Sequence, residues 1–185
     1  MAVRPVRQLG DPILRARCEP VKKVRSPAVR VVADDLQDTL RYLKQEFGRG
    51  RGLAAPQIGA PLCIVYLDWP RPCFMINPEI VDIGTDDFEV WDDCFSVPEL
   101  LVRVQRAHSI VVSYTDLAGR SHTMDAEGAL AELVQHELDH LNGILMLDQP
   151  AGLDPFCLRS EWTKHYGDAN RYGAPQPRES VEVPC

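Results

Sequence analysis

The chain has 185 residues and a formal net charge of −7 at pH 7, with 45% hydrophobic and 25% charged residues. This composition is typical of a soluble globular domain that buries a sizeable core, and the negative charge argues against a nucleic-acid-binding surface. No apolar run approaches the roughly 18 residues of a membrane span, and the N-terminus lacks the apolar segment of a signal peptide. We therefore expect a cytoplasmic protein with no membrane contact.

The first third of the chain predicts one long helix followed by a loop. Ser26 is a suitable N-cap and Pro27 a suitable first helical residue. Apolar residues then recur at helical spacing until Gly48, which ends the helix. The residues expected on its buried face are Val32, Leu36, Leu40, Leu43 and Phe47. A glycine-containing loop is expected over residues 49–59.

The middle of the chain predicts β-structure. Segments 61–68 and 74–84 are apolar enough for buried strands, although Asn77-Pro78 interrupts the second. Segment 88–104 is typical of irregular to extended structure. Segments 109–115 and 121–125 are joined through Ala118-Gly119, which favours a hairpin.

A second amphipathic helix is expected over 127–141, ended by Asn142-Gly143. The residues expected to face the core are Leu130, Val134, Leu138 and Leu141. A last helix is expected over 155–166. From Gly167 onward the chain is polar and proline-rich without periodicity. The sequence thus predicts one α+β domain over 1–166 and a flexible tail over 167–185.

The second helix carries the segment His-Glu-Leu-Asp-His at 136–140. His136 and His140 share one helical face, because four steps of about 100° nearly complete a turn. Both imidazoles can therefore bind one metal ion, and Glu137 can reach a water on that metal as general base. Cys94 and Glu161 are both candidates for a third ligand, Glu161 at the spacing of thermolysin-like metalloproteases.

Three segments in order resemble the motifs of the peptide deformylase family. Segment 50–59, Gly-Arg-Gly-Leu-Ala-Ala-Pro-Gln-Ile-Gly, is similar to the family's first motif. Segment 92–98, Asp-Asp-Cys-Phe-Ser-Val-Pro, is similar to the second, Glu-Gly-Cys-Leu-Ser, and 136–140 matches the third. The resemblance implies antiparallel sheets packed around a central helix that carries the HExxH motif.

The resemblance also implies the site residues. The ligands of one divalent metal ion would be Cys94, His136 and His140. The family often uses Fe²⁺ and tolerates Zn²⁺, Ni²⁺ or Co²⁺, and spacing cannot choose among them. Glu137 would be the general base and then the acid that protonates the leaving amine. The amide of Gln57 and the backbone N–H of Phe95 would stabilise the oxyanion.

Several positions near the implied substrate depart from the family's pattern. Asp93 stands where the second motif has glycine, and its charge would disfavour ionisation of a water on the metal unless it points into solvent. Arg51 and Glu132 replace hydrophobes that help enclose a methionine side chain. They could pair, bind a polar substrate group, or point outward and leave an apolar floor. The residues expected at the substrate are Gly50, Arg51, Gly52, Val90, Asp93, Ala129, Glu132 and Leu133.

The function implied is hydrolysis of an N-formyl group, with release of formate and a free amine, at N-formylmethionyl termini of nascent polypeptides. A transient ribosome contact is a further implication. Two alternatives are a deformylase-like enzyme for a polar or small N-formyl metabolite and a thermolysin-like metallopeptidase. We also expect Arg106 to pair with Asp139, which lies beside the metal-binding face of the helix.

Overall fold

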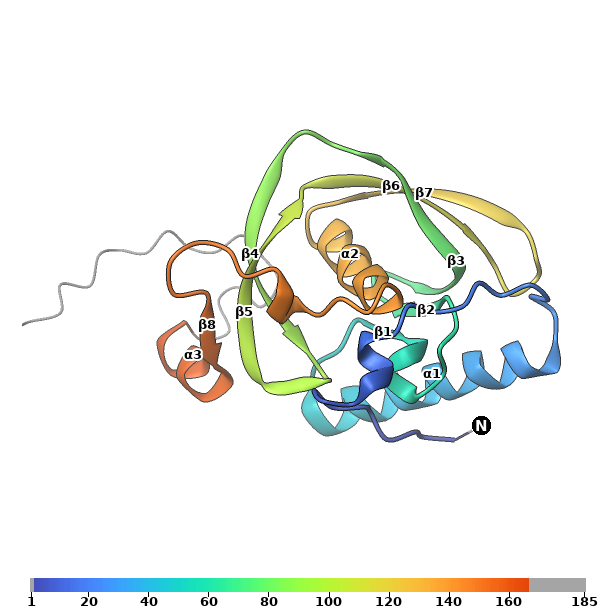
Figure 1. Cartoon of the computed structure of the whole chain (residues 1–185), viewed down its shortest axis with the longest axis horizontal. Helices are drawn as coiled ribbons and strands as arrows, with labels where there is room; N and C mark the ends of the chain where they lie inside the picture. The colour runs from blue at the N-terminus through green and yellow to red at the C-terminus, as the bar shows by residue number, and fades with distance from the viewer. Residues whose placement is uncertain (1, 167–185) are drawn as a thin grey trace, which may run out of the picture.

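The computed structural model describes residues 2–166, which form two antiparallel sheets with one helix between them (Figure 1). The strands are β1 (Gly52–Ala54), β2 (Ile64–Asp68), β3 (Pro72–Ile83), β4 (Asp87–Cys94), β5 (Val97–Ala107), β6 (Ser109–Thr115), β7 (Ser121–Glu127) and β8 (Phe156–Leu158). The helices are α1 (Pro27–Phe47), α2 (Ala129–Leu141) and α3 (Arg159–His165), with 3-10 turns η1 (Pro12–Arg15), η2 (Ala55–Ile58) and η3 (Met146–Asp148). The tail expected over 167–185 lies outside the described residues.

Both edge strands of the larger sheet, β1 and β7, contact the central helix α2. One sheet has the order β1-β2-β3-β6-β7, and the other has the order β4-β5-β8. Helix α2, which carries residues 136–140, contacts β1 and β7 of the first sheet and β5 of the second. The expected α+β class, with antiparallel sheets around a central helix, is confirmed.

Strand β2 shows how the larger sheet is covered on both faces. Ile64 and Tyr66 pack with the apolar residues of α1, whereas Val65 and Leu67 pack with those of α2. Alternate residues of a strand point to opposite faces, so a sheet buried on both sides needs an unbroken apolar run. The run Ile-Val-Tyr-Leu over 64–67 meets that need, and all four residues are buried.

Helix α1 has the predicted caps. The Ser26 side chain accepts a hydrogen bond from the Val29 N–H at 3.3 Å, and Gly48 ends the helix with a φ of +64°. Of the face expected to be buried, Leu36, Leu40 and Leu43 are buried and Val32 is partly buried. Phe47 is 56% exposed, because it lies at the end of the helix, beyond the sheet.

Two segments differ from their predicted structure, and a third is more regular than predicted. The loop expected over 49–59 contains the strand β1 and the turn η2. Segment 88–104, expected to be irregular to extended, is extended on both sides of a short turn. It belongs to the long hairpin β4–β5, in which Val90 pairs with Val104 and the inward-facing residues alternate with polar ones. The helix expected over 155–166 is divided into β8 and α3, since Leu158 pairs with Leu100 of β5. In each case pairing with another strand sets the structure.

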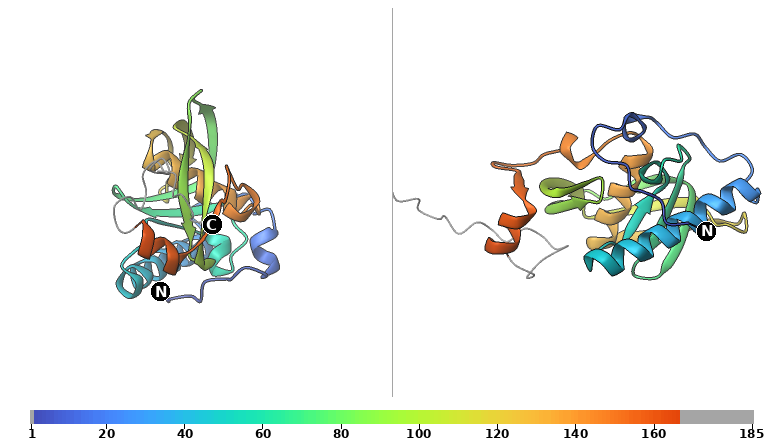
Figure 2. Two further views of the ribbon diagram at one scale, coloured as in Figure 1. Left: turned by 90° about the vertical axis from the view of Figure 1, so that its left-hand side faces the viewer. Right: turned by 90° about the horizontal axis from the view of Figure 1, so that it is seen from below.

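Helix α2 is buried on both its apolar and its polar face. Val134, Leu138 and Leu141 face the core as predicted, and Leu130 is partly buried. Within residues 2–166, no helix combines the length and the apolar character needed to cross a membrane. Figure 2 shows α3 beside β8, the edge strand of the smaller sheet, and near the C-terminal end of α1.

Candidate active site

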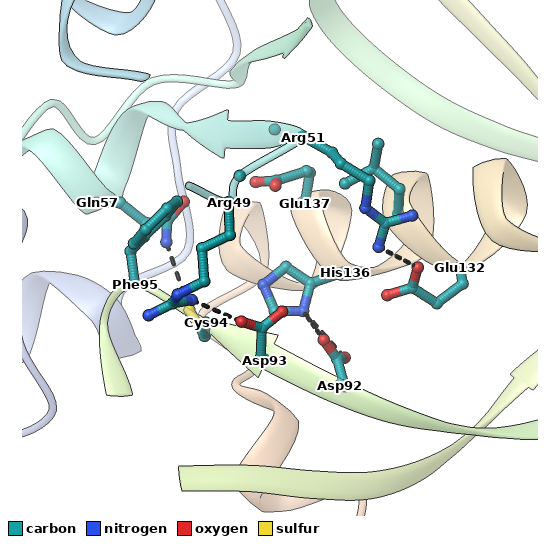
Figure 3. A pocket seen from close by; sticks show the side chains of 13 residues that line it. Arg49, Arg51, Gln57, Asp92, Asp93, Cys94, Phe95, Glu132, His136 and Glu137 are labelled. Atoms are coloured by element: carbon teal, nitrogen blue, oxygen red, sulfur yellow. Dashed lines mark hydrogen bonds and ion pairs between the residues drawn. The ribbon is translucent and has the colours of Figure 1, made fainter. Parts of the chain in front are cut away.

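Three possible metal ligands meet between α2 and the end of β4. One ligand atom from each of Cys94, His136 and His140 lies within 4.8 Å of the other two, and all three residues are buried. The Cys94 Sγ lies 3.3 Å from Nε2 of His140. Figure 3 shows the Cys94 and His136 side chains in the same cleft, approached from β4 and from α2. The two elements therefore supply one donor group from residues more than forty positions apart.

Asp92 fixes the orientation of His136. The Nδ1 of His136 lies 2.9 Å from Oδ1 of Asp92, so the ring donates there and its Nε2 is left as an acceptor for a metal (Figure 3). Arg106 donates to Asp92 at 2.9 Å and to Asp139 at 2.5 Å, which is the contact expected from the sequence. Burial opposes ionisation of Asp92, but His136 and Arg106 outweigh it and hold the pKa of Asp92 well below its usual range.

Glu137 points into the cleft and is free to take part in proton transfer. It is 3% exposed, and its Oε2 has no hydrogen-bond partner among residues 2–166. Gly52 makes room for it, because a Cβ on that residue would lie 2.5 Å from Oε1 of Glu137. Burial, the largest cause, raises the pKa of Glu137 to about 7. A carboxylate in this range suits general acid–base chemistry near neutral pH.

Gln57 directs its amide nitrogen toward the same group. Its Oε1 accepts a hydrogen bond from the Ala54 N–H at 2.9 Å, which fixes which end of the amide points inward. Its Nε2 lies 3.4 Å from the Cys94 Sγ and 3.3 Å from the Ser96 hydroxyl. The Ser96 N–H donates to the same sulfur at 3.4 Å. The sulfur thus accepts hydrogen bonds from both Gln57 and Ser96.

The donor set fits a divalent transition-metal ion. One thiolate and two imidazoles are donors that Fe²⁺ and Zn²⁺ accept, and three protein ligands leave one position for water or substrate. The carboxylate on His136 is the usual partner of an imidazole that binds metal. Glu161 does not belong to this group. Its carboxylate instead bonds to Lys164 at 2.6 Å on α3, where its side chain is 45% exposed.

The cleft around these residues runs between β1 and β4. Six of the eight residues expected at the substrate line it, namely Gly50, Arg51, Gly52, Asp93, Glu132 and Leu133. Val90 and Ala129 do not line it. Val90 packs in the apolar cluster of the smaller sheet, and Ala129 accepts a hydrogen bond from Arg51 through its carbonyl. Arg49 also lines the cleft. Nothing in the sequence pattern marked it as a site residue.

Arg51 and Glu132 form a buried ion pair in the cleft wall. Nη2 of Arg51 lies 2.5 Å from Oε2 of Glu132 (Figure 3), and Nη1 donates to the Ala129 carbonyl at 3.0 Å. Of the arrangements that the sequence left open, pairing is the one present. Burial raises the pKa of Glu132, and Arg51 opposes that effect.

Asp93 is bound by two arginines and does not point into open solvent. Nη1 of Arg49 lies 2.5 Å and Nη2 of Arg159 lies 2.9 Å from Oδ2 of Asp93. The charge that was expected to disturb the metal is therefore compensated within the protein. Neither arginine was identified from the sequence, because α3 and the end of α1 meet here only through the fold.

Comparison with known protein sequences gives one consistent result. A sequence model of the family described as polypeptide deformylase matches residues 3–155. The peptide deformylase of Dictyoglomus thermophilum is 40% identical over 148 residues, which are 80% of this chain and 92% of that protein. The peptide deformylase of Afipia carboxidovorans is 37% identical over 171 residues, covering 89% of this chain and 96% of its own.

Solved structures agree with the sequence comparison. The crystal structure of peptide deformylase from Thermotoga maritima has a TM-score of 0.76 at 33% identity, covering 82% of this chain and all of that one. The enzyme from Ehrlichia chaffeensis in complex with actinonin also has a TM-score of 0.76, at 32% identity, covering 82% and 90%. The resemblance indicated by the three motifs is confirmed: the chain belongs to the peptide deformylase family.

Proposed function

We propose that this protein hydrolyses the N-formyl group of formylmethionyl termini of nascent polypeptides, releasing formate and a free amine. The observation that carries the proposal is the buried group of Cys94, His136 and His140, with Glu137 beside it in an open cleft. Family membership supports the same reaction. Residues 1–166 would act as one catalytic domain, in the cytoplasm where new chains emerge, with a transient ribosome contact.

The metal ion that we propose is Fe²⁺, held by Cys94, His136 and His140. One soft thiolate and two imidazoles support this choice, and Zn²⁺, Ni²⁺ or Co²⁺ could occupy the same donors. Such an ion would supply Lewis acidity, lowering the pKa of a water molecule and polarising the formyl carbonyl. Asp92 would keep His136 in the tautomer that binds metal.

Glu137 would carry the proton through the reaction. Its vacant Oε2 accepts a proton from the attacking water as the oxygen bonds to the formyl carbon. When the C–N bond breaks, the same carboxyl group gives that proton to the amine nitrogen. The products are then the amine and formic acid, and formic acid gives its remaining O–H proton to the amine or to solvent and leaves as formate, so atoms and charge balance without a further reactant.

Gln57 and Phe95 would stabilise the negative charge that develops on the formyl oxygen. The Gln57 Nε2 is aimed at the group by the hydrogen bond to Ala54, so it needs no reorientation during the reaction. The backbone N–H of Phe95 lies next to Cys94 in the chain and would be the second donor. A preorganised donor of this kind typically lowers the barrier by a few kcal/mol, about 2.7–4 kcal/mol in a well-studied case.

The edge strands on either side of the cleft favour a peptide as substrate. The strand β1 is an edge strand of the larger sheet and β4 an edge strand of the smaller one, and residues of both line the cleft. Edge strands present backbone donors and acceptors that an extended peptide can pair with. An extended formyl peptide is thus a better match to this cleft than a compact metabolite.

The test is a formate-release assay with metal-loaded protein. The substrates are formyl-Met peptides and a panel of small N-formyl amino acids, and the free amine is measured in parallel. The proposal predicts turnover of the peptides well above that of the single amino acids. Turnover of a small N-formyl compound with none of the peptides would contradict it.

A further inference from the structure

A second hollow adjoins the catalytic cleft at the end away from Glu132. It has a volume of about 220 Å³ and lies between α3 and the C-terminal end of α1. Arg49 and Asp93 line both the hollow and the cleft, so the two spaces meet at these side chains. A ligand too long for the cleft can therefore continue into the hollow.

The charged groups where the two spaces meet favour an anionic ligand. Arg49 and Arg159 both donate to Oδ2 of Asp93, so the three side chains sum to one positive charge. Arg159 is held in place by a second bond, from its Nε to the Pro98 carbonyl at 2.5 Å. Glu99 on the rim opposes this charge, but it is exposed and water screens it.

Trp162 adds a buried hydrogen-bond donor to the lining of the hollow. The residue is only 5% exposed, and its indole Nε1 has no hydrogen-bond partner among the described residues. A buried N–H without an acceptor is costly, so such groups are usually satisfied by a ligand or water. Nε1 has almost no surface open to the hollow that Trp162 lines, so a ligand oxygen would reach it only after a small movement of the surrounding side chains.

We infer that this hollow is a substrate subsite that receives an acidic side chain at the second or third residue of the formyl peptide. The inference rests on the proposed function, because the formyl group must lie at Cys94 and His136 for the rest of the peptide to extend past Arg49. A carboxylate would complete the donors of Arg159 and Trp162 and balance the positive charge. A lysine at the same place would meet two arginines.

The test compares formyl-Met-Ala-Glu, formyl-Met-Ala-Lys, formyl-Met-Glu-Ala and formyl-Met-Lys-Ala on the metal-loaded wild-type protein. At one of the two positions, kcat/KM should favour glutamate over lysine by about fivefold or more, as a partly buried charge interaction of this kind gives. The ratio should fall as salt is added. A glutamate-to-lysine ratio near one at both positions overturns the inference.

Three variants locate the effect. Arg159→Met and Trp162→Phe should each reduce the glutamate-to-lysine ratio, Arg159→Met to within about twofold of unity. Arg120→Met removes the same charge from the exposed β6–β7 turn, where the side chain is 74% exposed, and should leave the ratio unchanged. A wild-type ratio that survives in both Arg159→Met and Trp162→Phe places the preference elsewhere and overturns the subsite.

Binding separates this inference from the proposed function. The Kd of each peptide is measured on Glu137→Gln protein, in which turnover is blocked. If the wild-type protein has no deformylase activity but the Kd values still favour glutamate, only the proposed function fails. If formyl-Met-Ala is hydrolysed while kcat/KM and Kd show no preference, only the subsite fails.

Discussion

Asp92 connects the candidate metal centre to the rest of the protein. It accepts from His136 on one side and from Arg106 on the other, and Arg106 continues to Asp139 and to Gln149 at 3.0 Å. The charged side chains of Asp92, Arg106 and Asp139 are buried or nearly so, and each is paired. Breaking a buried pair typically costs about 3–5 kcal/mol, so this series of contacts holds the His136 imidazole rigidly.

Replacement of single ligands distinguishes the two metal sites considered. Cys94→Ala should remove most of the bound metal, since it deletes the thiolate of the buried donor group. Glu161→Ala should leave the metal content unchanged, because that carboxylate bonds to Lys164 on the surface of α3. Metal per chain, measured by elemental analysis after dialysis, decides the point. Loss of metal from the Glu161 variant alone would overturn the donor set.

The Arg51–Glu132 pair should limit how well the cleft holds a methionine side chain. A charged wall forfeits part of the about 1.5–3 kcal/mol that burial of such a side chain provides. Arg51→Ile together with Glu132→Ile should therefore raise kcat/KM on formyl-Met peptides, by up to roughly tenfold. Either single replacement should be worse than the pair, because it leaves one buried charge alone.

The kcat/KM of the wild-type protein on formyl-Met peptides can contradict this prediction for the Arg51–Glu132 pair. If it already equals that of a housekeeping deformylase measured beside it, the ion pair does not limit methionine binding. The double replacement would then bring no gain, and the roles of Cys94, His136, His140 and Glu137 would be unaffected.

Among the elements, α1 is joined to the N-terminal segment by one buried carboxylate. Asp35 accepts from the Ala2 N–H at 2.9 Å and from Arg4 Nε at 2.7 Å. Burial opposes ionisation, but these hydrogen bonds and the charge of Arg4 outweigh it and lower the pKa of Asp35. A lowered folded-state pKa contributes stability above the unfolded value of about 3.9 and loses it as pH falls through the folded value.

Asp35→Asn should reveal this contribution. At pH 7 the free energy of unfolding should fall by about 1–3 kcal/mol, the cost of a buried polar group that loses its partner. Because the contribution disappears with protonation, the wild-type and variant values should converge below about pH 4. Denaturant unfolding of both proteins from pH 7 to pH 3 measures the difference. A constant difference over that range would assign it to packing instead of charge.

Local sequence signals predicted the two longer helices well. Ser26, Gly48 and the apolar spacing between them are all within one segment, so α1 follows from local rules. Segment 88–104 was predicted only as irregular to extended. Its pairing as the hairpin β4–β5 was not predicted, because its inward residues, such as Val90 and Val104, are separated by charged ones that suggest a surface segment. The strand β8 forms only because β5 is beside it. No local pattern encodes such a partner.

In the whole molecule, too, residues placed by local sequence were predictable and residues placed by the fold were not. The centre of the site belongs mainly to the first kind and its surroundings to the second. His136 and Glu137 were predictable, since one helical turn places both in the cleft. Cys94 came from the family resemblance, because its position beside α2 depends on the fold. Arg49 comes from the loop after α1 and Arg159 from α3, and both meet Asp93 of β4 only in the folded protein, so no spacing in the sequence indicates their contact.

Both sheets pack against α2, which carries two of the three proposed metal ligands. The central proposal is that a buried metal centre, with Glu137 as proton carrier, hydrolyses N-formyl peptides. The most direct test is formate release from formyl-Met-Ala by wild-type and Glu137→Gln proteins that carry equal amounts of metal. The wild-type protein should turn over, and Glu137→Gln should be slower by about 10²–10⁴-fold, because glutamine cannot accept the proton. Near-equal rates, or no turnover by metal-loaded wild-type protein, would contradict the account.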